Sequence, residues 1–401
     1  MGRYQKLIFF NLKTNKYSSI TIQMTKKLKT MSLIIISIIS LLTLGITLFI
    51  NLSPEFGGSI NQLQKMRYEK SENYNNGKFV NEEKVNLDMS LTEIGKSIIK
   101  YINPPKNTSP NKEIAVEKLD SLKIATYKGK TRLIWFGHST FLMQTNTKNI
   151  LIDPMFGITP APHPTLGSKR FSTELPIEIE QLPNIDAVLI SHDHYDHLDY
   201  GSIQLLKNKV GIFYTPLGVG THLMAWGIEE KRIIELDWWQ EQEFEGLKFA
   251  CTPAQHFSGR GLTNRSSTLW CSWVIQSETE SIFFSGDSGY GPHFKEIGNQ
   301  YGPFDFAMLE CGQYNEMWSE IHMFPEETVQ AGIDVKAKKI MPIHWGAFKL
   351  AMHNWAEPVE RIIKKANSEN VNLIVPKIGE IILLDSNTTT KTSNWWEEEN
   401  N

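Results

Sequence analysis

From Ala187 to Asp199 the sequence reads AVLISHDHYDHLD, the segment with the strongest signal for the fold. It opens as an apolar β-strand pattern that ends at Ser191. Among the next six residues are four candidate metal ligands: His192, His194, Asp196 and His197. Imidazole and carboxylate groups are common ligands of zinc and similar divalent metals. Three of the chain's 11 histidines within six residues, directly after a buried strand, favour a ligand cluster over a polar loop that contains histidines by chance.

The spacing in this loop indicates two ions rather than one. Residues i and i+2 at a strand end point the same way, so His192 and His194 can hold one ion. A tight turn then lets the next two ligands face a second ion. Four ligands do not complete two sites, so further ligands are needed at the ends of later strands. The sequence offers His256 after KFACTPAQ, Asp287 after SIFFSG and His344 after KKIMPI. Each alone is typical of a structural residue, but together they supply what two metals need.

The rest of the chain from Thr131 onward predicts stacked sheets. Short β-rich runs recur: TRLIWF, FLMQT, NILID, AVLIS, GIFYT, LKFACT, TLWCSWVIQ, SIFFSGD, DFAMLE, KIMPIHW, NLIVP and EIILLD. Helical patterns lie between some of them, notably Pro325 to Lys336 and Trp355 to Asn367. Several strands follow one another without a helix, which excludes a simple alternating βα arrangement. The pattern favours sheets packed together with helices outside.

These motifs resemble the metallo-β-lactamase superfamily, and within it the group of phospholipases D that hydrolyse N-acyl-phosphatidylethanolamine. The resemblance runs from about Leu133 to His344. It is carried by WFGHST (135–140), HDHYDHLD (192–199), LWCSWV (269–274), SGDSGY (285–290) and IHWGAF (343–348). It implies an α/β (α+β) fold, a four-layer αββα sandwich over residues 125–385, with the metals at one edge between the sheets.

The resemblance also implies how the ligands are shared. One ion is expected on His192, His194 and His256, the other on Asp196, His197 and His344, with Asp287 bridging both. Zinc is the expected metal for both sites, because the ligands are imidazole and carboxylate without thiolate. A metal spacing of roughly 3.5–4 Å suits displacement at phosphorus by a hydroxide held between the ions.

Three further residues each leave two interpretations open. His322 matches a family position near the substrate head and is expected to act as a general acid, unless it is a surface histidine before Pro325. Tyr195 lies in the loop of residues 192–198, the metal loop. Its hydroxyl is placed to donate to a phosphate oxygen, or else the ring only packs. His138 either orients a metal ligand or is a plain core histidine.

The N-terminus predicts a membrane anchor. Ser32 to Leu52 is 21 residues without a charge and follows Lys26, Lys27 and Lys29. Such a run makes roughly 30 Å of helix, enough for a hydrocarbon core. The positive-inside rule then places residues 1–31 in the cytoplasm and the hydrolase domain on the periplasmic or extracellular side. The alternative is a cleaved signal peptide, whose apolar region should be shorter.

The flanking segments and the composition complete the picture. Residues 53–124 are polar and are interpreted as a tether and an N-terminal extension that packs along the main domain, with a short amphipathic helix from Leu91 to Ile102. Residues 386–401 are expected to be disordered. The net charge of −3 and the lack of a long basic block argue against a nucleic-acid partner. Cys251 and Cys271 lie in strand-like runs and are expected to be buried thiols.

The predicted function is metal-dependent hydrolysis of a phosphodiester, with an N-acyl-phosphatidylethanolamine-type phospholipid as the substrate that the resemblance implies. The first alternative is a lactonase or an ester or amide hydrolase that uses the same metals. The second is a membrane-anchored, non-catalytic protein that binds or senses a metal. Seven ligands without a cysteine favour an open hydrolytic site over a structural one. The oligomeric state is not predicted.

Overall fold

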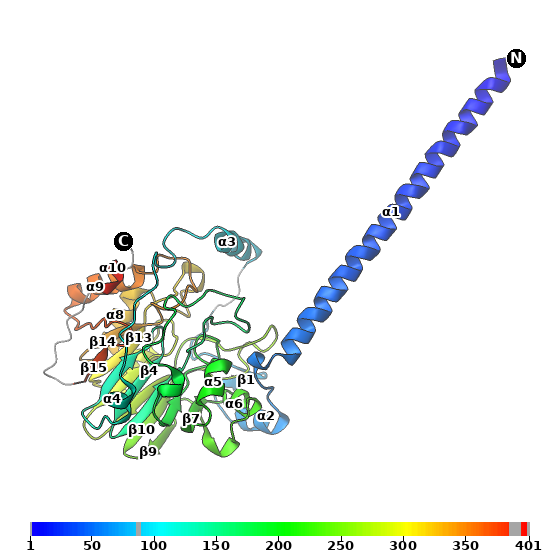
Figure 1. The fold of residues 1–401 in the computed structure, drawn as a ribbon. Coiled ribbons are helices and arrows are strands. Elements are labelled where there is room, and N and C mark those ends of the chain that lie inside the picture. Colours follow the sequence, from blue (N-terminus) through cyan, green and yellow to red (C-terminus); the bar gives the residue numbers. More distant parts are fainter. Residues whose placement is uncertain (1, 86–89, 385–393, 399–401) are drawn as a thin grey trace. The chain divides into compact units, whose positions relative to one another are not determined.

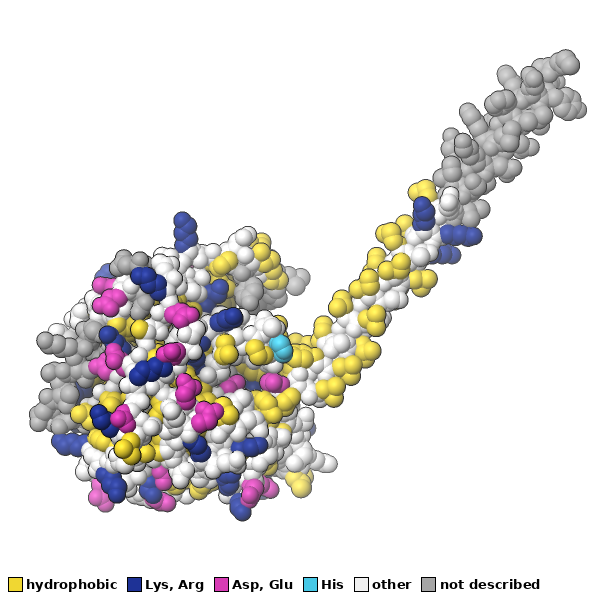
Figure 2. All heavy atoms as spheres, in the orientation of Figure 1, with side chains coloured by type: hydrophobic (Ala, Val, Ile, Leu, Met, Phe, Trp, Pro, Cys, Tyr) yellow, Lys and Arg dark blue, Asp and Glu magenta, His cyan; other side chains and the backbone are white. Residues whose placement is uncertain are grey.

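The computed structural model describes residues 2–85, 90–384 and 394–398, and the chain divides into two compact units, Met1–Ser53 and Pro54–Asn401 (Figure 1). The first unit is one helix, α1 (Gly2–Leu52). Its part Gln23–Leu52 is long and apolar enough to cross a membrane, and none of it is buried. Hydrophobic side chains cover this part of α1, with basic ones only toward its start (Figure 2). A membrane anchor and a signal sequence both meet this description.

The second unit is built on two β-sheets that enclose the main core. The first has seven strands in the order β15-β3-β4-β5-β6-β7-β8. They span Arg132–Trp135 (β3), Phe141–Thr145 (β4), Lys148–Ile152 (β5), Ile185–Leu189 (β6), Val210–Pro216 (β7), Ile233–Leu236 (β8) and Ile381–Leu383 (β15). The second has six in the order β14-β13-β12-β11-β10-β9. They span Glu241–Phe244 (β9), Leu247–Thr252 (β10), Ser272–Gln276 (β11), Ser281–Phe284 (β12), Phe306–Glu310 (β13) and Ile340–Ile343 (β14).

Helices cover the outer face of each sheet, so the layers are α, β, β and α (Figure 1). Side chains of α5 (Tyr200–Leu206) and α6 (Gly220–Ala225) join the outer core of the seven-stranded sheet. Those of α7 (His293–Gln300), α8 (Pro325–Asp334) and α9 (Glu357–Glu369) join the outer core of the six-stranded sheet. The expected αββα sandwich is confirmed.

The alternation of side chains along the strands explains why both faces of each sheet are covered. In β3, Leu133 and Trp135 point into the core between the sheets, whereas Ile134 points to the outer core under the helices. Apolar residues on both faces require a cover on both faces. The strand pattern of the sequence therefore specifies four layers.

The remaining elements are short and lie mostly near the two ends of the second unit. They are α2 (Gln62–Tyr68), β1 (Tyr74–Asn75), β2 (Lys78–Phe79), α3 (Leu91–Ile102), α4 (Ser121–Ala125), α10 (Trp395–Glu398) and 3₁₀ turns at Pro54–Phe56, Ile179–Gln181, Glu230–Arg232 and Glu316–Trp318. The expected helix over residues 91–102 is present as α3.

The sheet topology brings many strand ends to one edge. In the first sheet β5 and β6 are parallel, and β3 runs the same way because β4 is antiparallel to both of its neighbours. In the second sheet β12, β13 and β14 are parallel, and β10 runs the same way because β11 is antiparallel to β10 and β12. The residues that follow these strands can therefore meet at the carboxyl edge.

Both flanking segments pack on the domain, and one expectation about them needs correction. In the extension after Pro54, Tyr68 and Phe79 are buried in the main core. The tail is not disordered at residues 394–398: Trp395 and Trp396 are buried, and Trp395 stacks on Trp345 with ring centroids 5.5 Å apart. Two adjacent indoles offer more apolar area for burial than the polar residues around them suggest. The rest of the tail lies outside the described residues.

Four strands were not predicted, and one predicted strand is absent. The hairpin β1–β2, the strand β8 and the polar edge strand β9 lie in segments without clear alternation. The run NLIVP (372–376) forms only an isolated bridge, between Leu373 and Ile340. All three cysteines are free and buried, as expected for Cys251 and Cys271.

Candidate metal centre

Three imidazoles meet at the end of β6 and β10. His192 Nε2 lies 2.9 Å from His194 Nδ1, which lies 3.1 Å from His256 Nε2. His256 Nδ1 faces the carbonyl of Ile321 at 3.1 Å. Because a carbonyl accepts only, Nδ1 carries the proton and Nε2 turns its lone pair toward the other two rings. Three ring nitrogens at this spacing can all be satisfied by one cation.

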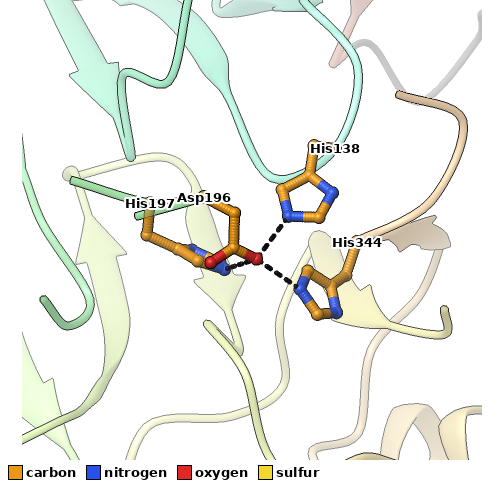
Figure 3. Close-up of side chains that lie close together, drawn as sticks. All are labelled: His138, Asp196, His197 and His344. Carbon is orange, nitrogen blue, oxygen red and sulfur yellow. Dashed lines mark hydrogen bonds and ion pairs between the residues drawn. The ribbon is translucent and has the colours of Figure 1, made fainter. Parts of the chain in front are cut away.

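A second group forms around the carboxylate of Asp196 (Figure 3). Its Oδ2 lies 2.9 Å from His138 Nε2, 3.1 Å from His344 Nε2 and 3.5 Å from His197 Nε2. The contact to His138 supports the interpretation that His138 orients a ligand, because its ring holds the carboxylate from the side of the β3 end.

Asp287, at the end of β12, lies between the two groups. Its Oδ1 is 3.1 Å from His197 Nε2, and its Oδ2 is 3.1 Å from His344 Nε2. The same Oδ2 is 3.8 Å from both His192 Nε2 and His256 Nε2. One carboxylate thus contacts imidazoles of both groups. The structure therefore brings all seven residues that the sequence singled out into one cluster.

The cluster fits metal ions. His197 Nε2 and Asp287 Oδ1 are buried and have no hydrogen-bond partner within the described ranges. An unpaired buried polar atom is costly, and here two such atoms lie 3.1 Å apart. The donors are nitrogen and carboxylate oxygen only, the set that zinc and similar divalent ions accept. The fold and the donor set agree on a metal site.

Two carboxylates that sequence reasoning missed support the ligands from behind. Asp153, after β5, lies with Oδ2 2.7 Å from His197 Nδ1. Glu310, at the end of β13, lies with Oε1 3.2 Å from His344 Nδ1. Both are fully buried. Each ends a β-rich run (NILID and DFAMLE), so the strand-end rule that found Asp287 could have found them. Carboxylates behind metal-binding histidines fix the ring orientation and the tautomer.

Burial and charge divide the metal-free cluster into two halves. Burial lowers the pKa of His192, His194 and His256, so these rings are neutral. Burial also acts to lower the pKa of His344, but the charge of Asp287 and the hydrogen bonds to Asp196 and Glu310 outweigh it and raise that pKa to about 10. The pKa of His197 is raised in the same way by nearby carboxylates.

Three ends of strands carry unusual backbone conformations at this edge. His138, Asp153 and His344 have φ values of +56°, +41° and +64°. Residues with a Cβ rarely adopt this left-handed region, and such residues cluster at functional sites. The sharp turn directs each side chain from the strand end toward the cluster.

A cavity of about 330 Å³ opens onto the cluster. Its polar floor includes Asp287 and His344, and its walls include Phe257, Met317 and Trp318. A polar floor with apolar walls is typical of a site that binds and orients an organic substrate.

His322 lies at this cavity, whereas Tyr195 does not line it. A nitrogen of His322 lies within 4.8 Å of ligand atoms of Asp287 and His256. Its Nδ1 is hydrogen-bonded to the carboxylate of Glu310. The Tyr195 hydroxyl instead donates to the carbonyl of Arg260 at 2.6 Å, so the expectation that it donates to substrate is wrong in this structure. The loop turns the phenol away from the cavity and packs it under the arginine.

The family assignment follows from this fold and cluster together with sequence similarity. The chain belongs to the metallo-β-lactamase superfamily, and residues 148–345 match the beta-lactamase superfamily domain. It is 30% identical to N-acyl-phosphatidylethanolamine-hydrolyzing phospholipase D 1 of Caenorhabditis elegans over 62% of this chain and 74% of that protein. It is 39% identical to an uncharacterized protein of Mycobacterium tuberculosis over 82% of this chain and 88% of that one.

Solved structures share the same fold. The isothiocyanate hydrolase from Delia radicum gut bacteria aligns with a TM-score of 0.51 at 22% identity, over 63% of this chain and 98% of that chain. The family match and the similarity to the phospholipase identify the protein as a metal-dependent hydrolase of the superfamily, as the sequence predicted at this coarser level.

Proposed function

We propose that the protein is a two-metal phosphodiesterase that hydrolyses a phospholipid of the N-acyl-phosphatidylethanolamine type, in the manner of a phospholipase D. The observation that carries the proposal is the carboxylate of Asp287, which contacts imidazoles of both ligand groups. The proposed ligands are His192, His194 and His256 for one ion and Asp196, His197 and His344 for the other. Two zinc ions there would supply the hydroxide nucleophile and neutralise charge on the phosphate.

His322 is proposed to protonate the leaving alcohol. Its side chain is 13% exposed, at the cavity, while its partner Glu310 is fully buried. Its ring stacks on His344 with centroids 5.2 Å apart, which holds it beside the ligands. The hydrogen bond between its Nδ1 and the buried carboxylate of Glu310 fixes the ring. This arrangement keeps the other ring nitrogen available for the substrate.

A second cavity supports an amphiphilic substrate. It also measures about 330 Å³ and shares Met317, Trp318 and Leu350 with the metal cavity. Its other walls include Ile98 of α3 and Met352, so its lining is mainly apolar. α3 also presents hydrophobic side chains at the surface (Figure 2). A phosphate at the metals would leave room here for an acyl chain.

The proposal includes an uncleaved anchor with the hydrolase domain on the non-cytoplasmic side. Its support is the charge asymmetry, because Lys26, Lys27 and Lys29 precede the apolar run and the first charge beyond it is Glu55. Protease added to intact spheroplasts should digest the domain. Survival of the domain until the membrane is opened would reverse the orientation, and a soluble domain cut near residue 53 would show a signal peptide.

The proposed function is tested by metal reconstitution of the full-length protein in detergent. Protein stripped with a chelator should be inactive, and about two equivalents of zinc should restore hydrolysis. The substrates are N-acyl-phosphatidylethanolamine in mixed micelles, bis-p-nitrophenyl phosphate and a simple lactone. We expect phosphatidate and an N-acylethanolamine from the lipid, and little lactone turnover. Lactone turnover without phosphodiester turnover would favour a lactonase, and no turnover with metal bound would favour a non-catalytic role.

Of the two ligand groups, only the one that contains Asp196 should lose ring protons when metal binds. The pKa of His344 in the metal-free protein is about 10, and that of His197 is also raised, so both rings carry a proton at pH 7. Metal must displace these protons, so filling both sites should release about two from the half that contains Asp196, in addition to the proton that a bound water loses when it becomes hydroxide. Metal affinity should therefore rise with pH between about 6.5 and 10. An indicator dye in weak buffer measures the release, and proton-neutral loading at pH 7 would contradict the assignment.

The raised pKa of His344 also determines how the stability of the metal-free protein changes with pH. Because the folded pKa of His344 lies above its ordinary value, its contribution to the free energy of unfolding of the metal-free protein is complete below pH 6.5. It is lost as the pH rises toward about 10. The gain in thermal stability from bound zinc should consequently be larger at pH 9 than at pH 6.5.

A further inference from the structure

The segment that follows α1 in the chain reaches the metal loop through His222. Gly58 N–H donates to His222 Nδ1 at 3.1 Å, and His222 Nε2 lies 3.1 Å from Asp193 Oδ2. A backbone N–H can only donate, so Nδ1 is the acceptor and Nε2 carries the proton that is donated to the carboxylate. Asp193 lies in sequence between His192 and His194. The two hydrogen bonds through His222 therefore connect Gly58 to the residue that lies between two candidate ligands.

The carboxylate of Asp193 accepts hydrogen bonds from three different residues, of which His222 is one. It is fully buried, and it also accepts from Gly259 N–H at 2.7 Å and from Thr268 Oγ1 at 3.0 Å. A buried carboxylate with all its partners in place fixes the backbone that carries it. Loss of the His222 donor would free one side of this carboxylate.

Arg260 makes a second link between the same segment and the metal loop. Its Nε and Nη2 donate to the carbonyl of Glu55 at 2.8 and 2.6 Å. Its Nη1 donates to the carbonyls of Asp193 and Leu198 at 2.6 and 2.7 Å. The guanidinium is 2% exposed and thus joins the extension to the beginning and the end of the metal loop.

Asn81 makes a third link, to the remaining histidine of the same ligand group. His256 N–H donates to Asn81 Oδ1 at 3.0 Å, and Asn81 Nδ2 donates to the carbonyl of His256 at 2.8 Å. This two-way pair fixes the backbone of His256. The extension therefore contacts the supports of all three histidines in the group His192, His194 and His256.

Two adjacent glycines make the close approach possible. A Cβ at Gly57, whose φ is +77°, would lie 2.0 Å from His222 Nδ1. A Cβ at Gly58 would lie 2.5 Å from the carbonyl oxygen of Thr221. Any side chain at either position would push the segment off His222.

We propose that residues 54–81 are a brace for the three-histidine group, with His222 and Asn81 as positioning residues for the ion that this group holds. The other ligand group is supported from different elements, by Asp153 and Glu310. The brace should therefore act on one ion and spare the other. It lies outside residues 148–345, which match the superfamily domain. The inference rests on the proposed metal site but not on the identity of the substrate.

The test is zinc titration of the full-length protein in detergent against a competing chelator, with the absorption spectrum of the cobalt-substituted protein as a second readout. The variants are Gly58→Ala, His222→Phe and Asn81→Leu. Each variant should bind one of the two zinc ions about 10–100-fold more weakly than the wild type and bind the other with an affinity within about twofold of the wild type. The cobalt bands of the weakened site should change in intensity or position.

Two controls separate positioning from folding. Gly95→Ala makes the same substitution in α3, where a Cβ meets open space, and should bind both ions as the wild type does. His222→Gln keeps one donor and one acceptor and should restore most of the lost affinity. If Gly58→Ala does not fold, His222→Phe and Asn81→Leu, which leave the two glycines intact, decide the question.

The proposal is overturned if the variants bind both ions with wild-type affinity and only unfold at a lower temperature, or if both ions weaken equally. Failure of the proposed function looks different. In that case the wild type would bind two ions and the variants would lose one, but no phosphodiester would be hydrolysed.

Discussion

Replacing Asp287 by alanine should abolish the binding of both ions and lower hydrolysis of bis-p-nitrophenyl phosphate by at least about 10³-fold. The carboxylate contacts His197 and His344 at 3.1 Å and faces the three-histidine group at 3.8 Å. Its removal takes a ligand from both proposed sites and leaves the ions without a negative charge between them. Elemental analysis and steady-state kinetics on the same preparation measure the two losses.

Two comparisons make this result specific to the bridging position. His344→Ala removes a ligand from one group only, so it should retain close to one zinc and some residual turnover. Asp305→Ala removes a carboxylate at the start of β13, the end opposite to Glu310, and should leave metal content and turnover unchanged. Near-normal metal content and turnover in Asp287→Ala would refute the bridging role.

Replacing His322 by alanine should lower kcat for the phospholipid by about 10²–10⁴-fold with little change in KM, because an alkoxide leaves slowly without a proton. Hydrolysis of bis-p-nitrophenyl phosphate should fall by less than about tenfold, since p-nitrophenolate departs without protonation. The difference between the two substrates identifies a general acid. The His322→Ala variant and the wild type are compared at equal zinc occupancy.

The exposed His163 provides the matched control for His322. His163→Ala should leave both activities unchanged, because the ring is exposed, hydrogen-bonds to the neighbouring Thr165 and does not line the metal cavity. Equal losses on both substrates in His322→Ala would assign His322 a role in binding or metal support instead. A zinc content below that of the wild type would point to the same conclusion, because Glu310 holds both His322 and His344.

Much of the fold and of the candidate site could be predicted because the relevant signals are local. Short continuous apolar runs predict strands with two buried faces, and polar residues that end these runs mark the carboxyl edge of a sheet. The residues His192 to His197 and the later Asp287 follow this rule. The same rule applied to NILID and DFAMLE would have added Asp153 and Glu310.

Sequence patterns alone were enough to predict the four-layer sandwich, the seven residues that cluster at its edge and the apolar N-terminal helix. Three features depend instead on how the folded chain packs: the orientation of Tyr195, the burial of Trp395 and Trp396 in the core, and the contacts of the extension with the metal loop. Gly58 and His222 are 164 residues apart, and Asn81 and His256 are 175 apart. Neither pair has a periodic signature, because a single hydrogen bond between distant segments depends on how packed elements bring them together. That information arises only when the whole core is assembled.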